Sequence, residues 1–221
     1  MTRKNASEDD VAARGAQRRR FEEGRGAWFR AHPLTPARWR DVEIVFGDGK
    51  GACSQCWCMY WRLPRKEFEA SLRDKNKALF KKRVRAGPPP GLIGYQNGEP
   101  VGWVQVGPRA DTPEWNGARR LTAPLDPEDA ENSRVWGVSC FAVKASARGE
   151  GIGTKMLDAA IDWARKNRAR VLEACPVDTQ GANRPRISIY HGVASTFTRA
   201  GFKEIARRRP DRPLMRLELS A

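Results

Sequence analysis

The chain has 221 residues, 40% of them hydrophobic, and carries 41 Lys and Arg against 26 Asp and Glu, a formal net charge of +15. This size favours one globular domain with a single core. No apolar run reaches about 18 residues and the first 20 residues are polar and charged, so a membrane span and a signal peptide are excluded and we expect a cytoplasmic protein. The positive charge attracts anionic partners: nucleic acid, an acidic surface or a polyanionic cofactor.

The first 26 residues carry clustered charge and few large apolar side chains, which predicts a flexible N-terminal arm ahead of a domain over residues 27–221. A first helix is expected from Thr35 and Pro36, with Gly47 as its stop. Its apolar face consists of Trp39, Val42, Ile44, Val45 and Phe46. A second helix, basic on its outside, is expected over 65–85, before Gly87 and three prolines.

Residues 92–95 and 101–106 read as two strands joined at Asn97-Gly98, a pair that tolerates the positive φ angles of a tight hairpin turn. Residues 107–133 lack periodicity and predict a long loop. Further strands are expected over 135–143, 171–174, 202–206 and 215–219, and further helices over 153–167 and 188–200. Strands interleaved with helices, some as hairpins, indicate an α/β or α+β domain around a mixed sheet.

The segment from Arg148 to Gly153 reads Arg-Gly-Glu-Gly-Ile-Gly and joins an apolar strand to a helix. A glycine-rich turn at a helix start directs unpaired N–H groups and the positive end of the helix dipole at one point, which suits a phosphate. Arg148 adds a charge that can pair with phosphate oxygens. The segment lacks the Gly-Lys-Ser/Thr of a Walker loop and the third glycine of the dinucleotide fingerprint.

This segment resembles the acetyl-CoA motif of the GNAT N-acetyltransferase superfamily, Arg/Gln-x-x-Gly-x-Gly/Ala. The preceding strand 139–143, the following helix and a closing Gly201-Phe202 pair match the family's order. The resemblance implies a central mixed, mostly antiparallel sheet flanked by helices, and acetyl transfer from acetyl-CoA to a primary amine of a small molecule, peptide or protein, without a metal. It also implies cofactor-binding residues: Phe141, Ala142 and Val143 for the pantetheine arm, and Arg148, Gly149, Gly151, Ile152, Gly153 and Thr154 for the pyrophosphate.

Direct transfer needs a base for the ammonium proton and an acid for the leaving thiolate. The tyrosine that many GNAT members carry five residues before the Gly-Phe phenylalanine is replaced here by Phe197. Tyr190 is a candidate acid from a shifted position, or a half-buried anchor of its helix. His191 is a candidate base, or a surface or capping residue, and Glu173 is a candidate base if its strand turns it to the cleft.

The segment Cys53-Ser54-Gln55-Cys56-Trp57-Cys58 supplies three cysteines, but a structural zinc site needs a fourth ligand at regular spacing. The only histidines in the sequence are His32 and His191, so no zinc site is predicted. The five cysteines, an odd number, are expected to stay reduced. A buried link between the first two helices is one interpretation of this region. The other is a wall of the acceptor cleft, with contacts from Trp57, Tyr60, Trp61 and Arg62.

A second hypothesis from another class is an acyl-CoA-binding regulatory or nucleic-acid-binding protein on the same fold without efficient catalysis. It rests on the charge of +15 and on Phe197. The chain lacks a recognition-helix signature and an aromatic-interleaved basic strand, which counts against specific nucleic-acid readout. A homodimer stays open, and no membrane partner is expected.

Overall fold

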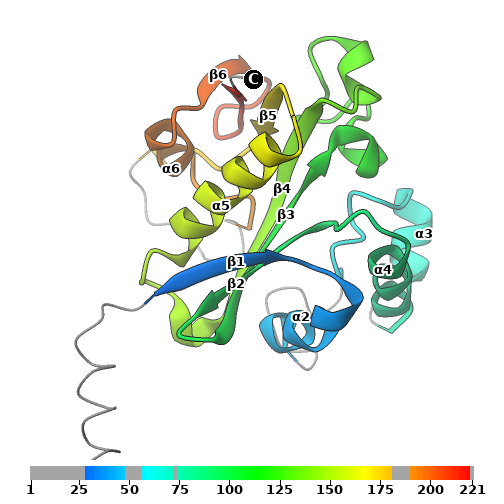
Figure 1. Cartoon of the computed structure of the whole chain (residues 1–221). Helices are drawn as coiled ribbons and strands as arrows, with labels where there is room; N and C mark the ends of the chain where they lie inside the picture. The colour runs from blue at the N-terminus through cyan, green and yellow to red at the C-terminus, as the bar shows by residue number, and fades with distance from the viewer. Residues whose placement is uncertain (1–27, 48–55, 72–73, 181–189, 220–221) are drawn as a thin grey trace, which may run out of the picture.

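In the computed structural model, the residues described are 28–47, 56–71, 74–180 and 190–219. They form a seven-stranded sheet in the order β1-β2-β3-β4-β5-β7-β6 (Figure 1). The strands are β1 (Phe29–Pro33), β2 (Gly91–Gln96), β3 (Glu99–Pro108), β4 (Val135–Val143), β5 (Val171–Ala174), β6 (Lys203–Arg207) and β7 (Pro213–Glu218). Neighbours are antiparallel except β4 and β5, which are parallel. The expected mixed, mostly antiparallel sheet flanked by helices is confirmed.

Helices cover both faces of the sheet. On one face lies α5 (Ile152–Lys166) with α6 (Ala194–Arg199), and on the other lie α2 (Trp39–Phe46), α3 (Arg65–Ala70) and α4 (Asp74–Ala86). Short 3-10 turns complete the chain: η1 (Pro36–Arg38), η2 (Arg109–Asp111), η3 (Pro113–Trp115), η4 (Pro127–Ala130) and η5 (Ala145–Ala147). Among the described residues, no helix is long and apolar enough to cross a membrane.

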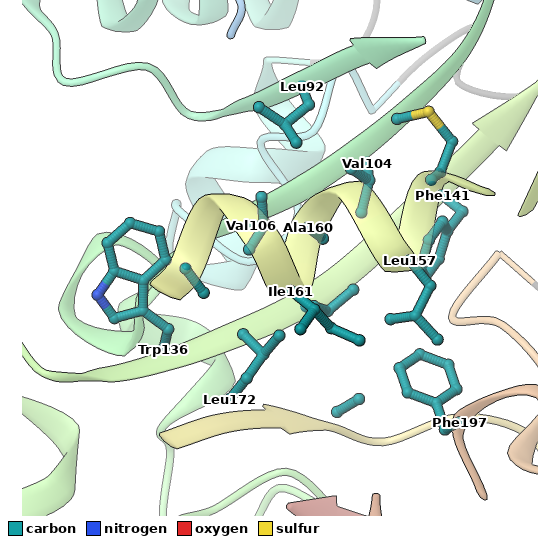
Figure 2. Packing of buried hydrophobic residues seen from close by; sticks show 14 of the residues in the cluster. Leu92, Val104, Val106, Trp136, Phe141, Leu157, Ala160, Ile161, Leu172 and Phe197 are labelled. Carbon is teal, nitrogen blue, oxygen red and sulfur yellow. The ribbon is translucent and has the colours of Figure 1, made fainter. Parts of the chain in front are cut away.

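The core between α5 and the sheet follows from helical spacing. α5 buries Ile152, Met156, Leu157, Ala160, Ile161 and Ala164, which recur every three or four residues. Figure 2 shows Leu157, Ala160 and Ile161 packed beside Val104 and Leu172 of the sheet. Removing each large aliphatic side chain from water contributes about 1.5–3 kcal/mol. This packing fixes the start of α5 against β4, where the glycine-rich segment lies.

Several predicted elements are confirmed and others need correction. The hairpin, β4, α5 and β5 form where expected. β1 was not predicted, because its five residues are short of apolar side chains and are ordered by pairing with β2. The helix over 65–85 is two helices, α3 and α4, and the loop over 107–133 contains η2, η3 and η4. Ile44, assigned to the apolar face of α2, is 41% exposed. The arm over residues 1–26 lies outside the described residues.

The helix predicted over 188–200 begins only at Ala194; its first two residues lie outside the described part of the chain. Gly192 has φ +80° and Val193 is extended, so neither continues a helix backwards. A Cβ at Gly192 would lie 2.6 Å from Cε2 of Phe197. Residues 190–193 are therefore not helical: a turn at Tyr190 and His191 leads to Val193, which forms an isolated bridge with Val177 before α6 begins.

Candidate functional site

The parallel pair of β4 and β5 separates at its carboxyl end. Val138 pairs with Ala174, the last residue of β5, and β4 continues to Val143. The register with β3 shifts opposite Ser139, since Gln105 pairs with Cys140 and Val106 with Val138. Such a bulge bends the strand and redirects its side chains. The last third of β4 is thereby left with an edge facing away from β3.

The chain that enters α6 runs along this edge. The Phe141 N–H donates to the carbonyl oxygen of Tyr190 at 2.6 Å, and the Val177 N–H donates to the carbonyl oxygen of Gly192 at 3.0 Å. The Ala194 N–H in turn donates to the Val177 carbonyl at 2.9 Å. Tyr190 to Ala194 therefore bridges β4 and the segment that follows β5.

A cavity of about 730 Å³ lies where β4, the glycine-rich segment and α6 meet. Every residue predicted to bind the cofactor lines it: Phe141, Ala142, Val143, Arg148, Gly149, Gly151, Ile152, Gly153 and Thr154. Tyr190 lines it as well. The sequence interpretation missed six lining residues: Ala147, Leu157, Gly192, Val193, Thr196 and Phe197. Only Phe197 carried a signal, as the residue at the family's tyrosine position.

The glycine-rich segment is shaped as an anion cradle. Gly149 and Gly151 have φ of +85° and +74°, which disfavours any side chain there. The first helical hydrogen bond of α5 runs from the Lys155 N–H to the Gly151 carbonyl at 3.1 Å. The N–H groups of Ile152 to Thr154 come before it and have no acceptor within the helix. A Cβ at Gly149, Gly151 or Gly153 would meet nothing within 4 Å. Open space above unpaired amides suits a pyrophosphate.

One predicted contact involves an amide that already has a partner. The resemblance implies that the main chain of Phe141 and Val143 hydrogen-bonds the pantetheine arm, and in this structure the Phe141 N–H donates to the carbonyl oxygen of Tyr190. The side chain of Phe141 packs edge-on against Phe197, at 6.2 Å between ring centroids, and both belong to the core beneath the cavity. Phe141 therefore contributes an apolar floor, and its amide becomes available only if Tyr190 shifts.

Tyr190 lines the cavity and is 46% exposed. Partial burial raises the pKa of its phenol, and nearby Cys140 and Tyr60 raise it further. The hydroxyl is therefore protonated at neutral pH. A protonated phenol at the cavity can donate a proton, as the acid role requires.

His191 is buried and neutral. Burial and, to a smaller extent, the charge of Arg212 lower its pKa to about 3, against the opposing effect of a hydrogen bond to the Ser139 carbonyl. Nδ1 lies 2.9 Å from that carbonyl oxygen, so Nδ1 carries the proton. A group with a pKa near 3 takes a proton from an ammonium too weakly to serve as a general base, and the base role proposed for His191 is not supported.

The buried His191 makes a testable prediction for stability. Its folded pKa of about 3 lies below its ordinary 6.5, so the unfolded chain binds the proton first as the pH falls. The contribution of neutral His191 to the free energy of unfolding is fully present above pH 6.5 and is lost as the pH falls toward 3. We expect a loss of about 2 kcal/mol between pH 7 and pH 5. Urea unfolding of wild type and His191→Asn at both pH values measures it. An equal loss in the variant would show that other groups are responsible.

Glu173 does not face the cavity. Its side chain is 0% exposed and lies between the guanidinium groups of Arg109, also 0% exposed, and Arg216, whose Nη2 is 2.6 Å from Oε1. Arg109 also stacks on Trp115, with 4.5 Å between its Cζ and the ring centroid. The alternation along β5 turns Glu173 to the face opposite α5, where it is held by two cations. Glu173 therefore does not meet the condition set for its base role, that its strand turns it to the cleft, and that role stays a prediction without support from this geometry.

The four residues predicted to contact the acceptor divide into two groups. Trp57 is 5% exposed and stacks on Trp39 at 5.8 Å in the core under α2, and Arg62 donates from Nη1 to the Asp111 carbonyl at 2.6 Å. Both are structural. Tyr60 and Trp61 lie together, at 4.6 Å between centroids, and the ring of Trp61 is 5.9 Å from His191. Only this second pair is near Tyr190.

The described cysteines are Cys56, Cys58, Cys140 and Cys175, none in a disulfide, whereas Cys53 lies outside the described residues. Cys58 accepts a hydrogen bond from the Trp103 indole at 3.1 Å. Within the described ranges, no group of three or more His, Cys, Asp or Glu side chains could hold a metal ion. The buried-link interpretation therefore fits Cys58, and Cys56 and Cys140 lie near Tyr190.

Comparisons with known proteins agree with this geometry. The sequence model of the Acetyltransferase (GNAT) family matches residues 57–193, more than half of the chain. A GNAT-family acetyltransferase structure from Listeria monocytogenes aligns at a TM-score of 0.52 and 11% identity, over 86% of this chain and 95% of that one. At this identity it supports the fold alone.

Two further solved structures have TM-scores of 0.49. An N-acetyltransferase from Staphylococcus aureus is 16% identical over 87% of this chain and 99% of its own. The PaiA N-acetyltransferase from Thermoplasma acidophilum, crystallised in complex with coenzyme A, is 12% identical over 86% and 99%. No curated protein matches the sequence significantly.

Proposed function

This chain belongs to the acetyltransferase (GNAT) family, and we propose that it transfers an acetyl group from acetyl-CoA to a primary amine of a small molecule or peptide. The observation that carries the proposal is the single cavity that joins the glycine cradle, the end of β4 and Tyr190. A pyrophosphate-bearing thioester requires an anion site and a proton donor in one cavity, and both line this one.

The cavity fits the cofactor in its charge and its size. The free amides of Ile152 to Thr154 and the positive end of α5 would hold the pyrophosphate, and Arg148, whose Nε donates to the Val143 carbonyl at 3.2 Å, borders that position. The end of β4 would hold the pantetheine arm. About 730 Å³ is a volume typical of small-molecule sites.

When bound, acetyl-CoA supplies a thioester carbonyl open to attack and a thiolate leaving group. Tyr190 holds a proton at its phenol oxygen and, on this proposal, gives it to the departing sulfur. On this proposal Tyr60, which is partly buried, and Trp61, whose ring it contacts, would border the acceptor amine. With Glu173 ion-paired and His191 a weak base, the ammonium proton would leave through solvent before attack.

Changing Tyr190 to phenylalanine tests the acid role. The variant keeps the ring and loses the phenol proton, so we expect kcat to fall about 100-fold while the Kd for acetyl-CoA changes less than threefold. Free thiol release, with an amine found by mass-spectrometric screening of an amine library, gives kcat, and calorimetry gives Kd. An unchanged kcat would remove Tyr190 from the chemistry.

The second candidate, an acyl-CoA-binding regulatory or nucleic-acid-binding protein, is favoured by Phe197, which is 1% exposed and has no group to donate. It predicts saturable acetyl-CoA binding with no acetylated product from any amine. It also predicts DNA or RNA binding that weakens steeply with salt, since lysine and arginine displace counterions. A flat or absent salt response would exclude that partner.

A further inference from the structure

Arg212 occupies the turn between β6 and β7, beside the end of β5. The strand order sets β7 next to β5, and the Asp178 N–H donates to the Asp211 carbonyl at 2.9 Å, which ties the turn to the segment after β5. The Arg212 N–H donates to the Arg209 carbonyl at 3.0 Å, which closes the turn. The backbone at Arg212 is thus fixed at the end of the sheet where β4 and β5 separate.

The guanidinium of Arg212 differs from the others of this hairpin. The other arginines contact acids or carbonyl oxygens: Arg207 with Glu204 and Asp178, Arg208 with the carbonyls of Leu121 and Ala123, Arg209 with Asp211, and Arg216 with Glu173 and Asp129. In the part of the chain that the structure describes, Arg212 pairs with no carboxylate. Its Nε is buried and without a hydrogen-bond partner, and the guanidinium interacts with the Cys175 thiol.

Arg212 lies among the residues near Tyr190 where we expect the acceptor amine to bind. Backbone hydrogen bonds tie its turn to this side: the Asp178 N–H donates to the carbonyl of Asp211, the residue before Arg212, and the neighbouring Val177 N–H donates to the carbonyl of Gly192, the residue after His191. In agreement with this placement, the charge of Arg212 lowers the pKa of His191. Trp61 packs with Cys175 and with Leu214, two residues after Arg212. Arg212 therefore places a cation beside Trp61 and His191, and Tyr190, the chain neighbour of His191, lines the cavity.

A half-buried guanidinium without a counter-ion is electrostatically costly, and an anionic ligand group would offset the cost. Its planar fork of N–H groups matches the two oxygens of a carboxylate. The same charge repels an ammonium group, so an acceptor carrying both groups would bind with its carboxylate at Arg212 and its amine directed away from it, toward Tyr190.

We propose that Arg212 binds the carboxylate of the acceptor, which makes the substrate a small amine bearing a carboxylate, such as an amino acid. This inference rests on the proposed function, because it names the substrate class of the same site. It makes Arg212 a specificity-determining residue for acetyl transfer.

Matched acceptors test this assignment. Each proteinogenic amino acid is offered beside its carboxamide and its decarboxylated amine, and acetylated products are quantified by mass spectrometry. We expect at least one amino acid to exceed both partners in kcat/KM by about 10- to 100-fold, the range for a charge-assisted hydrogen bond. Equal use of an acid and its carboxamide, or preference for a phosphonate analogue, would overturn the proposal.

Variants of the turn separate the site from general charge. Arg212→Gln should abolish the preference for the acid by raising the KM for the acid. Its kcat/KM for the carboxamide should stay within threefold of wild type. Arg212→Lys should retain part of the preference, because it keeps the charge without the fork. Arg209→Gln is the control, since it removes the same charge from an exposed position in the same turn. If Arg212→Gln lowers both acceptors equally, Arg212 is structural.

The experiment also distinguishes this inference from the proposed function. If acetyl-CoA binds and no amine is acetylated, the transferase proposal fails, and ligand-observed NMR of the same amino acids with the CoA complex still tests Arg212. Saturable binding to wild type that disappears in Arg212→Gln supports the carboxylate site. Identical spectra for the two proteins refute it.

Discussion

Replacing Gly153 by aspartate should weaken acetyl-CoA binding at least about 100-fold without lowering stability. Gly153 lies in the first turn of α5 and lines the cavity, and a Cβ there points into open space. A carboxylate at this position would oppose the pyrophosphate, and two like charges near 4 Å apart repel by about 4 kcal/mol at the effective dielectric of a protein surface. The same carboxylate favours the helix, because an acid in the first turn complements the dipole and glycine is a poor helix former.

Two matched variants of Gly153 identify the cause. Asparagine has the shape of aspartate without the charge, so a smaller loss in Gly153→Asn assigns the remainder to electrostatics. Alanine satisfies the Gly/Ala position of the motif and should bind within about threefold of wild type. Calorimetry gives Kd and thermal unfolding gives Tm. Tight binding by Gly153→Asp would mean that the pyrophosphate lies elsewhere, and a lower Tm would make the result one of folding.

The cofactor end of the site could be predicted from sequence because it is local. Strand, glycine turn and helix are consecutive in the chain, and the positive φ of Gly149 and Gly151 follows from the residue type. All nine predicted cofactor residues therefore line one cavity. The amide of Phe141 was the exception, because its partner Tyr190 is 49 positions away and reaches it only through the sheet order.

The acceptor end could not be predicted in the same way. Trp57 and Trp61 are four positions apart in one aromatic segment, yet the first packs on Trp39 in the core and the second on His191. Both residues are tryptophans, so hydrophobicity does not distinguish the two positions. The turn between them determines which one packs in the core and which one packs beside His191. Arg212 carried no distinguishing signal among 41 basic residues; its unpaired state depends on where the acids of β5 and β6 lie.

The surroundings of Glu173 could not be predicted from its strand alone. The hypothesis that Glu173 is a base required its strand to turn it to the cleft, but its side chain lies on the face opposite Leu172, which packs with α5. The partner Arg109 comes from 64 positions earlier, in the segment after β3 that the sequence predicts as a long loop without periodicity. A buried carboxylate therefore looked like a base until the two arginines around it were known.

The second large effect is expected at this buried cluster. Glu173→Ala should lower the free energy of unfolding by about 3–5 kcal/mol, because it leaves Arg109 charged, buried and without its acid. Burial lowers the pKa of Arg109 and Glu173 opposes this, which shows how far the cation depends on its partner. Glu173→Gln should lose less, since the amide oxygen still accepts a hydrogen bond from one arginine.

Chemical denaturation measures the loss, and a surface pair supplies the control. Glu69 forms an exposed ion pair with Arg65, so Glu69→Ala should unfold at the wild-type midpoint. Activity then separates a structural from a chemical role. At a temperature where Glu173→Gln is fully folded, kcat and its pH profile should match wild type if the carboxylate only neutralises Arg109 and Arg216. A loss of the acidic limb of the pH profile at full folding would instead restore Glu173 as a base, acting through a water chain across the sheet.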